Sequence, residues 1–135
     1  QAELLGHLEG HLVKANHASG GSAGNSMIAT AQFGAPTFMS CKVANDADGD
    51  IYIADLEAAG VDHCFTGERE PGTTGKCLVL VSPDAERSMN THLSISETLS
   101  EEQLVPAAIE QSEYLYLEGY LVTSPTGRAA AVKAR

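Results

Sequence analysis

The chain has 135 residues, 43% hydrophobic and 19% charged, which is typical of one globular domain or part of one and not of a disordered chain. The formal net charge of −10 argues against a nucleic-acid partner and against an anionic membrane surface. No apolar run approaches the roughly 20 residues that cross a bilayer, so we expect no membrane partner.

Three cysteines, Cys41, Cys64 and Cys77, are far apart and include no Cys-x-x-Cys pair. An odd number at this spacing favours reduced thiols in a cytoplasmic protein over a disulfide framework. Cys41 and Cys77 lie in apolar runs, so we expect both to be small core residues.

Four leucines recur at helical spacing and predict an amphipathic helix over 2–15: Leu4, Leu5, Leu8 and Leu12. His7 and His11 lie four apart on it, but Leu8 stands where a zinc-protease helix needs glutamate. We therefore expect these histidines to be structural.

A glycine-rich turn, Gly20-Gly21-Ser22-Ala23-Gly24-Asn25, runs into a predicted helix over 23–33. Adjacent glycines allow positive φ and close approach of a ligand to the main chain. A helix start also offers unpaired N–H groups, and the Asn25 amide can both donate to and accept from hydroxyls. The turn is therefore a candidate site for a hydroxylated or anionic ligand.

The next segments predict a βα unit. Residues 37–43 are an apolar strand, and Asn45-Asp46 begins a helix that ends at Gly60. The acidic cluster 46–50 resembles a calcium loop, but Ala44 would occupy the first ligand position and Asp55 the place of the bidentate glutamate. We expect these acids to cap the helix instead.

Residues 76–81 and 87–93 predict a β-hairpin around the turn 82–86. Ser100 begins a capping box, which predicts a helix extending to Ile109. Residues 114–117 (YLYL) predict a buried strand that ends at Glu118, and Ser124-Pro125 starts a last helix. Alternating helices and strands predict a layered α/β fold with parallel strands, whose ligands bind at strand ends near Glu118.

A rival motif overlaps the glycine turn, because residues 20–24 also match the Gly-x-Ser-x-Gly elbow of serine hydrolases with Ser22 as nucleophile. That elbow follows an apolar strand, whereas residues 13–19 are largely polar. Asp62 or Asp84 with His92 would have to complete the triad, and no spacing supports them.

The order of these motifs resembles the N-terminal half of the ribokinase-like PfkB family of carbohydrate and nucleoside kinases. The similarity runs from Ser19 to Gly127. Its carriers are GGSAGN (20–25), Gly34-Ala35, KVANDADGD (42–50), LEAAGVD (56–62), the stretch 73–93 and YLYLEGYLV (114–122). The resemblance implies a three-layer αβα core with a small β-sheet lid, formed by about 62–66 and 74–93. It also implies that residues 1–135 are the N-terminal part of the kinase domain.

Members of this family use ATP and Mg²⁺ to phosphorylate a hydroxymethyl group on a sugar or nucleoside. The resemblance places Gly20, Gly21 and Asn25 at the substrate, with Glu118 as a carboxylate that accepts from substrate hydroxyls. It also implies that Thr74 and Met89 are lid positions that close over the ligand, and that two subunits pair through the lid sheet.

The catalytic Gly-x-Gly-Asp segment of the family and its ATP site belong to a C-terminal half that this sequence lacks. We therefore expect a piece of a larger kinase, with no catalytic or metal-binding residue of its own and no turnover alone. A non-catalytic ligand-binding or interaction module on the same fold is the alternative.

Overall fold

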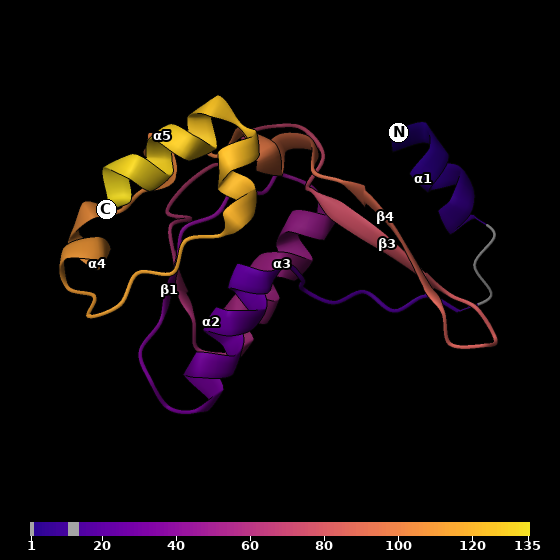
Figure 1. The fold of residues 1–135 in the computed structure, drawn as a ribbon, viewed down its shortest axis with the longest axis horizontal. Coiled ribbons are helices and arrows are strands. Elements are labelled where there is room, and N and C mark those ends of the chain that lie inside the picture. The colour runs from indigo at the N-terminus through magenta and orange to yellow at the C-terminus, as the bar shows by residue number, and fades with distance from the viewer. Residues whose placement is uncertain (1, 11–13) are drawn as a thin grey trace.

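Two helices, α2 (Ser22–Gln32) and α3 (Ala47–Ala58), form the middle of the fold in a computed structural model that describes residues 2–10 and 14–135. The two helices overlap in the view of Figure 1. The contact between them is tight at Gly24, where an added Cβ would lie 2.6 Å from the hydroxyl oxygen of Tyr52 on α3. Both helices confirm the sequence prediction, and the Asp46 side chain caps α3 by accepting from the Gly49 N–H at 2.9 Å.

The βα unit closes through a short parallel sheet. β1 (Phe38–Met39) precedes α3 and β2 (Asp62–His63) follows it, with Phe38 opposite Asp62 and Met39 opposite His63. The predicted strand 37–43 is thus only two residues long. The predicted lid boundary needs a correction as well, because 62–63 pair with β1 and not with the hairpin. The lid itself stays a prediction, and it would rest on the second sheet alone.

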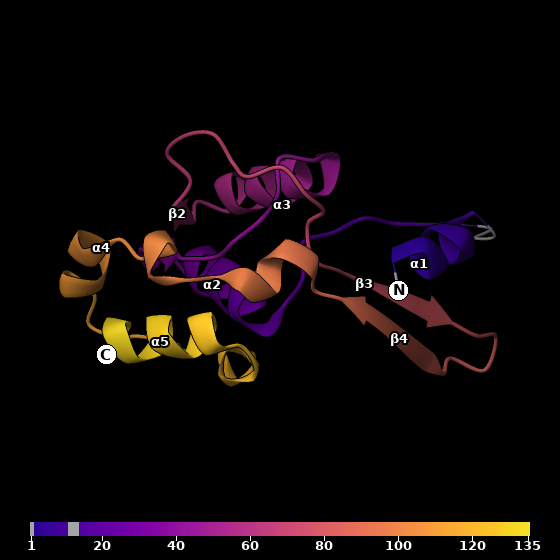
Figure 2. The same ribbon diagram turned by 90° about the horizontal axis from the view of Figure 1, so that it is seen from above.

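That second sheet is the predicted hairpin, β3 (Lys76–Val81) and β4 (Arg87–His92), paired antiparallel along their full length. It projects away from α2 and α3 in both views (Figures 1 and 2). One face carries Cys77, Val79 and Met89, all exposed. The expectation that Cys77 is a core residue is therefore wrong, and Cys41 is only half-buried.

The first helix is shorter than predicted. α1 covers Ala2–Glu9, and a turn follows at Gly10. Leu12 and His11 lie outside the described residues, so the predicted end of this helix and the second histidine are not described. α1 lies beside the hairpin (Figure 2), where Lys76 Nζ on β3 is 3.2 Å from Glu9 Oε1.

The C-terminal third is mostly helical. It contains the 3-10 helices η1 (Ser94–Thr98), η2 (Glu101–Gln103) and η3 (Gly119–Thr123) and the α-helices α4 (Pro106–Glu110) and α5 (Pro125–Ala134). The capping box at Ser100 is present, but it opens only η2. Pro106 has no N–H and restricts the residue before it, so the single predicted helix becomes two. The last helix is confirmed, capped by Ser124 through the Gly127 N–H.

The predicted buried strand at 114–117 is wrong. Among the described residues this segment pairs with no strand, and Tyr114 and Tyr116 are 90% and 50% exposed. A strand needs a neighbour to bond its N–H and C=O groups, and the apolar sequence alone does not supply one.

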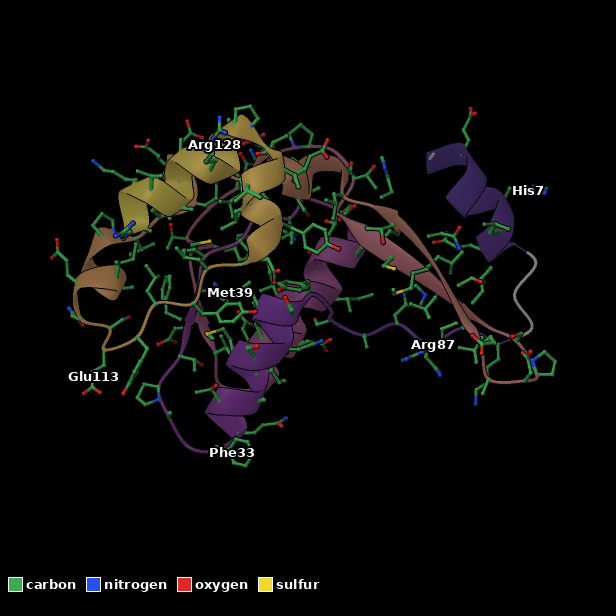
Figure 3. The ribbon with its side chains drawn as sticks, in the orientation of Figure 1. His7, Phe33, Met39, Arg87, Glu113 and Arg128 are labelled. Carbon is green, nitrogen blue, oxygen red and sulfur yellow. The ribbon has the colours of Figure 1, made fainter. Side chains whose placement is uncertain are left out.

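The buried core is small, and most of its members are small residues: Val43, Ala44, Leu56, Val61, Ala130 and Ala134. In Figure 3, Met39 lies among other side chains within the body, whereas Phe33 points outward from the end of α2. None of the described helices is long and apolar enough to cross a membrane.

Candidate substrate site

The glycine turn adopts the conformation that its sequence predicts. Gly21, the residue before α2, has φ 84°, a backbone conformation in which most other residues are strained. Its carbonyl accepts from the Asn25 N–H at 3.0 Å, which closes the first turn of the helix. No side chain caps this helix start, so its first N–H groups remain available to a ligand.

Glu118 meets the glycine turn directly. The Ser22 hydroxyl at the start of α2 donates a hydrogen bond to the Glu118 carboxylate, which joins residues 96 positions apart in the sequence. Glu118 is half-buried and precedes η3, whose N–H groups its side chain does not cap. It therefore does not stand at a strand end as predicted, yet it lies beside the glycine turn.

Asn25 lies on the same face of α2 as Ser22. Residues three apart on a helix are neighbours, with Cβ atoms about 5–6 Å apart. Asn25 is exposed, so its amide is accessible to a ligand beside the Ser22–Glu118 contact. The structure thus brings the sequence-predicted Gly21, Asn25 and Glu118 to one end of α2.

The turn is also anchored from α3. Asp55 accepts from the Ser19 N–H at 2.9 Å, which fixes the residue before Gly20. The Ser19 hydroxyl oxygen is buried and has no hydrogen-bond partner among the described residues. Our sequence reading missed both Ser19 and the role of Ser22 as donor to Glu118. The motif itself offered a signal, since both serines flank the two glycines.

Thr74 is buried and fully engaged inside the protein. Its hydroxyl donates to Asp46 Oδ1 at 2.5 Å and accepts from the Ala44 N–H at 3.0 Å, while its own N–H donates to Asp46 Oδ2 at 2.8 Å. Partial burial opposes ionisation of Asp46, but these bonds from Thr74, with that from Gly49, lower its pKa. Thr74 therefore ties the base of the hairpin to α3, which leaves no hydroxyl hydrogen to donate to a ligand, and its lid role stays a prediction.

Met89 occupies a different environment. It lies on β4 opposite Val79, and its side chain is 74% exposed. An exposed apolar side chain on a projecting hairpin can cover a ligand or a second subunit, so the lid role of Met89 stays a prediction.

The arrangement gives less support to a serine hydrolase site and to a metal site. The Ser22 hydroxyl donates to a carboxylate, whereas a serine nucleophile needs a base such as histidine. Across residues 2–10 and 14–135, no group of three or more His, Cys, Asp or Glu side chains could hold a metal ion. The cluster 46–50 caps and flanks α3, as expected.

Comparison with known proteins identifies the class to which this fold and site belong. The sequence matches the pfkB family of carbohydrate kinases over residues 5–134, so the chain belongs to that family. The resemblance stated from the motifs is thereby confirmed, together with the ribokinase-like α/β fold.

Individual relatives show how much of the fold is present. The structure of adenosine kinase from Sinorhizobium meliloti superimposes with a TM-score of 0.88 and 34% identity, covering 98% of this chain and 41% of that one. The structure of a probable sugar kinase from Rhizobium etli superimposes with a TM-score of 0.88 and 33% identity, covering 98% of this chain and 40% of that one. Mouse ribokinase is 26% identical over 113 residues, which are 84% of this chain and 35% of the relative. The chain thus spans well under half the length of these relatives.

Proposed function

We propose that the protein carrying these residues transfers a phosphoryl group from ATP to a hydroxymethyl group of a sugar or nucleoside. This chain would supply the substrate-binding half. Family membership supports kinase chemistry, and the similar structures include an adenosine kinase and a probable sugar kinase.

One observation carries the assignment of the site: the Ser22–Glu118 hydrogen bond, which brings the glycine turn and a half-buried carboxylate together. A carboxylate accepts strongly from hydroxyls, and the neighbouring Asn25 amide can donate to the same ligand. Ser22 would hold Glu118 in place until substrate hydroxyls share that carboxylate.

The family resemblance assigns the catalytic segment and the ATP site of these kinases to the C-terminal half, and the chain spans about 41% of the adenosine kinase structure that it matches. We therefore propose that ATP and Mg²⁺ bind mainly to parts of the protein outside this chain, and we assign no catalytic residue here. Phosphoryl transfer requires both charge neutralisation and a positioned hydroxyl, and this chain would contribute only the second. We expect residues 1–135 alone to release no ADP.

Two further proposals concern the setting of the protein. All three cysteines are free thiols, which supports a reducing, cytoplasmic location. The exposed apolar face of the hairpin, with Val79, Val81 and Met89, supports a homodimer that pairs through the lid sheet.

The test is turnover by the full-length protein. With ATP, Mg²⁺ and a panel of nucleosides and sugars, we expect ADP release that depends on one class of acceptor and loses most of its rate in Glu118→Gln. No ADP release above the rate without acceptor, combined with measurable ligand binding, would instead favour the alternative of a non-catalytic binding module.

A further inference from the structure

Two cysteines meet at the carboxyl ends of the parallel strands. Met39 pairs with His63, so Cys64 immediately follows β2 and Cys41 lies two residues after β1. The Cys64 thiol donates to the Cys41 carbonyl at 3.2 Å and accepts from the Cys41 N–H at 3.5 Å. These two bonds hold the Cys64 sulfur against the backbone of Cys41.

The two thiols differ in their acidity. A hydrogen bond with Cys64, together with burial, raises the pKa of Cys41. The same contact lowers the pKa of the Cys64 thiol, and His63 acts in the same direction. Such an asymmetric pair provides one thiolate to attack and one neighbouring thiol to resolve, the arrangement found in redox-sensitive cysteines.

Nothing else in the proposed mechanism uses this pair. Both Cys41 and Cys64 are half-buried, whereas Cys77 is exposed and lies on β3. Tyr52 packs between this pair and α2. Burial and its contact with Cys41 raise the pKa of its hydroxyl, and that hydroxyl lies 2.6 Å from where an added Cβ at Gly24 would stand.

We propose that Cys41 and Cys64 form a dithiol site that a hydroperoxide converts to an intramolecular disulfide. The Cys64 thiolate attacks the peroxide oxygen, so that an S–O bond forms, the O–O bond breaks and the leaving oxygen takes a proton as alcohol or water. The Cys41 thiol then displaces hydroxide from Cys64, forming the S–S bond and releasing water with the Cys41 proton. Both sulfurs are oxidised, the peroxide is reduced by two electrons, and a small thiol reverses the change.

Trypsin makes this site easy to map, because cleavage after Lys14, Lys42, Arg69, Lys76 and Arg87 places each cysteine on its own peptide. Cys41 falls in 15–42, Cys64 in 43–69 and Cys77 in 77–87. The folded chain is treated with hydrogen peroxide, alkylated, digested without reductant and analysed by mass spectrometry.

We expect a disulfide to join peptides 15–42 and 43–69 in the protein from the monomer band of a non-reducing gel. The mass of the joined peptides should be lower by two hydrogens than the sum of the two separate masses. Dithiothreitol should separate them. The link should persist in Cys77→Ser and disappear in Cys41→Ser, where dimedone should instead label a sulfenic acid on Cys64. The proposal is overturned if all three wild-type cysteines remain equally alkylated after peroxide, or if Cys64 links only to Cys77 or to another molecule. The peptide map of the wild-type protein tests the proposal even if a variant fails to fold.

Discussion

At the scale of single residues, the site depends on how Ser22 and Glu118 come together. Ser22 begins α2 directly after Gly21, whose positive φ turns the chain into the helix. Its hydroxyl donates to Glu118, and the exposed Asn25 amide lies one turn away on the same face. Carboxylate and amide together can pair with the adjacent hydroxyls of a sugar ring.

Asn25→Ala in the full-length protein should weaken substrate binding. A lost hydrogen bond between neutral groups is worth about 0.5–1.5 kcal/mol, or roughly a two- to tenfold rise in Kd. Gln32→Ala at the exposed far end of the same helix is the matched control and should leave Kd unchanged. Equal affinity of the wild type and Asn25→Ala would remove this amide from the site.

At the scale of elements, the buried link between Thr74 and Asp46 connects the hairpin to α3. The Thr74 hydroxyl also accepts a hydrogen bond from the Ala44 N–H, and Thr74 and Ala44 are both buried. The link fixes where the hairpin leaves the body, and hence where a lid would stand relative to α2.

Thr74→Val should lower the free energy of unfolding by about 1–3 kcal/mol, because it leaves the buried Ala44 N–H without its acceptor and removes the hydroxyl donor to Asp46. Thr74→Ser keeps the hydroxyl and should recover most of the loss. The control Thr30→Val changes an exposed residue of α2 and should stay within about 0.5 kcal/mol of wild type. Urea unfolding of the three variants measures this, and a Thr74→Val variant as stable as Thr30→Val would contradict it.

The link between Thr74 and Asp46 also predicts that the free energy of unfolding depends on pH. The native pKa of Asp46 is below its ordinary value of 3.8, so its ionised form stabilises the fold above that pH. This contribution is lost as pH falls through the lower native pKa. The stability gap between wild type and Thr74→Val should therefore narrow as urea unfolding is repeated from neutral pH down to below 3.8. A gap that stays constant or widens over that range would be inconsistent with the role of Asp46.

Sequence reasoning succeeded at elements that carry their own local signals. Asp46 caps α3, Ser124 caps α5, and the hairpin turn lies where the periodicity changes.

Prediction from the sequence failed where contacts with distant residues determine the structure. The apolar run 114–117 looks like a strand but has no pairing neighbour among the described residues, and Pro106 divides a helix that its capping box seemed to begin. The Ser22–Glu118 contact spans 96 positions, so only the family resemblance could anticipate that the two regions converge.

At the scale of the whole molecule, the hairpin with α1 beside it and the remaining helices form two parts in Figures 1 and 2. Large apolar side chains remain exposed on both, including Val81 at 66% and Tyr120 at 72%. The relatives are more than twice as long as this chain, so further parts of such a protein can cover the helical side. The projecting hairpin is the surface that we propose for a second copy.

If the full-length protein dimerises through this sheet, replacing Val79 and Met89 by serine should weaken the dimer. Burial of each large apolar side chain contributes about 1.5–3 kcal/mol, so the dimer Kd should rise at least about tenfold in sedimentation velocity. Val132→Ser, at an equally exposed site on α5, is the control. A wild type that sediments as a monomer, or a double variant with unchanged Kd, would contradict pairing through the lid.

The most direct test of the central claim is calorimetric titration of the full-length protein with the acceptor found in the turnover panel. Glu118→Gln removes a charge-assisted acceptor worth about 1.5–3 kcal/mol, so its Kd should be at least about tenfold higher than that of the wild type. Glu113→Gln alters an exposed acid that points away from the body in Figure 3, and it should bind as the wild type does. Equal Kd values for wild type, Glu118→Gln and Glu113→Gln would show that the carboxylate beside Ser22 does not hold the substrate.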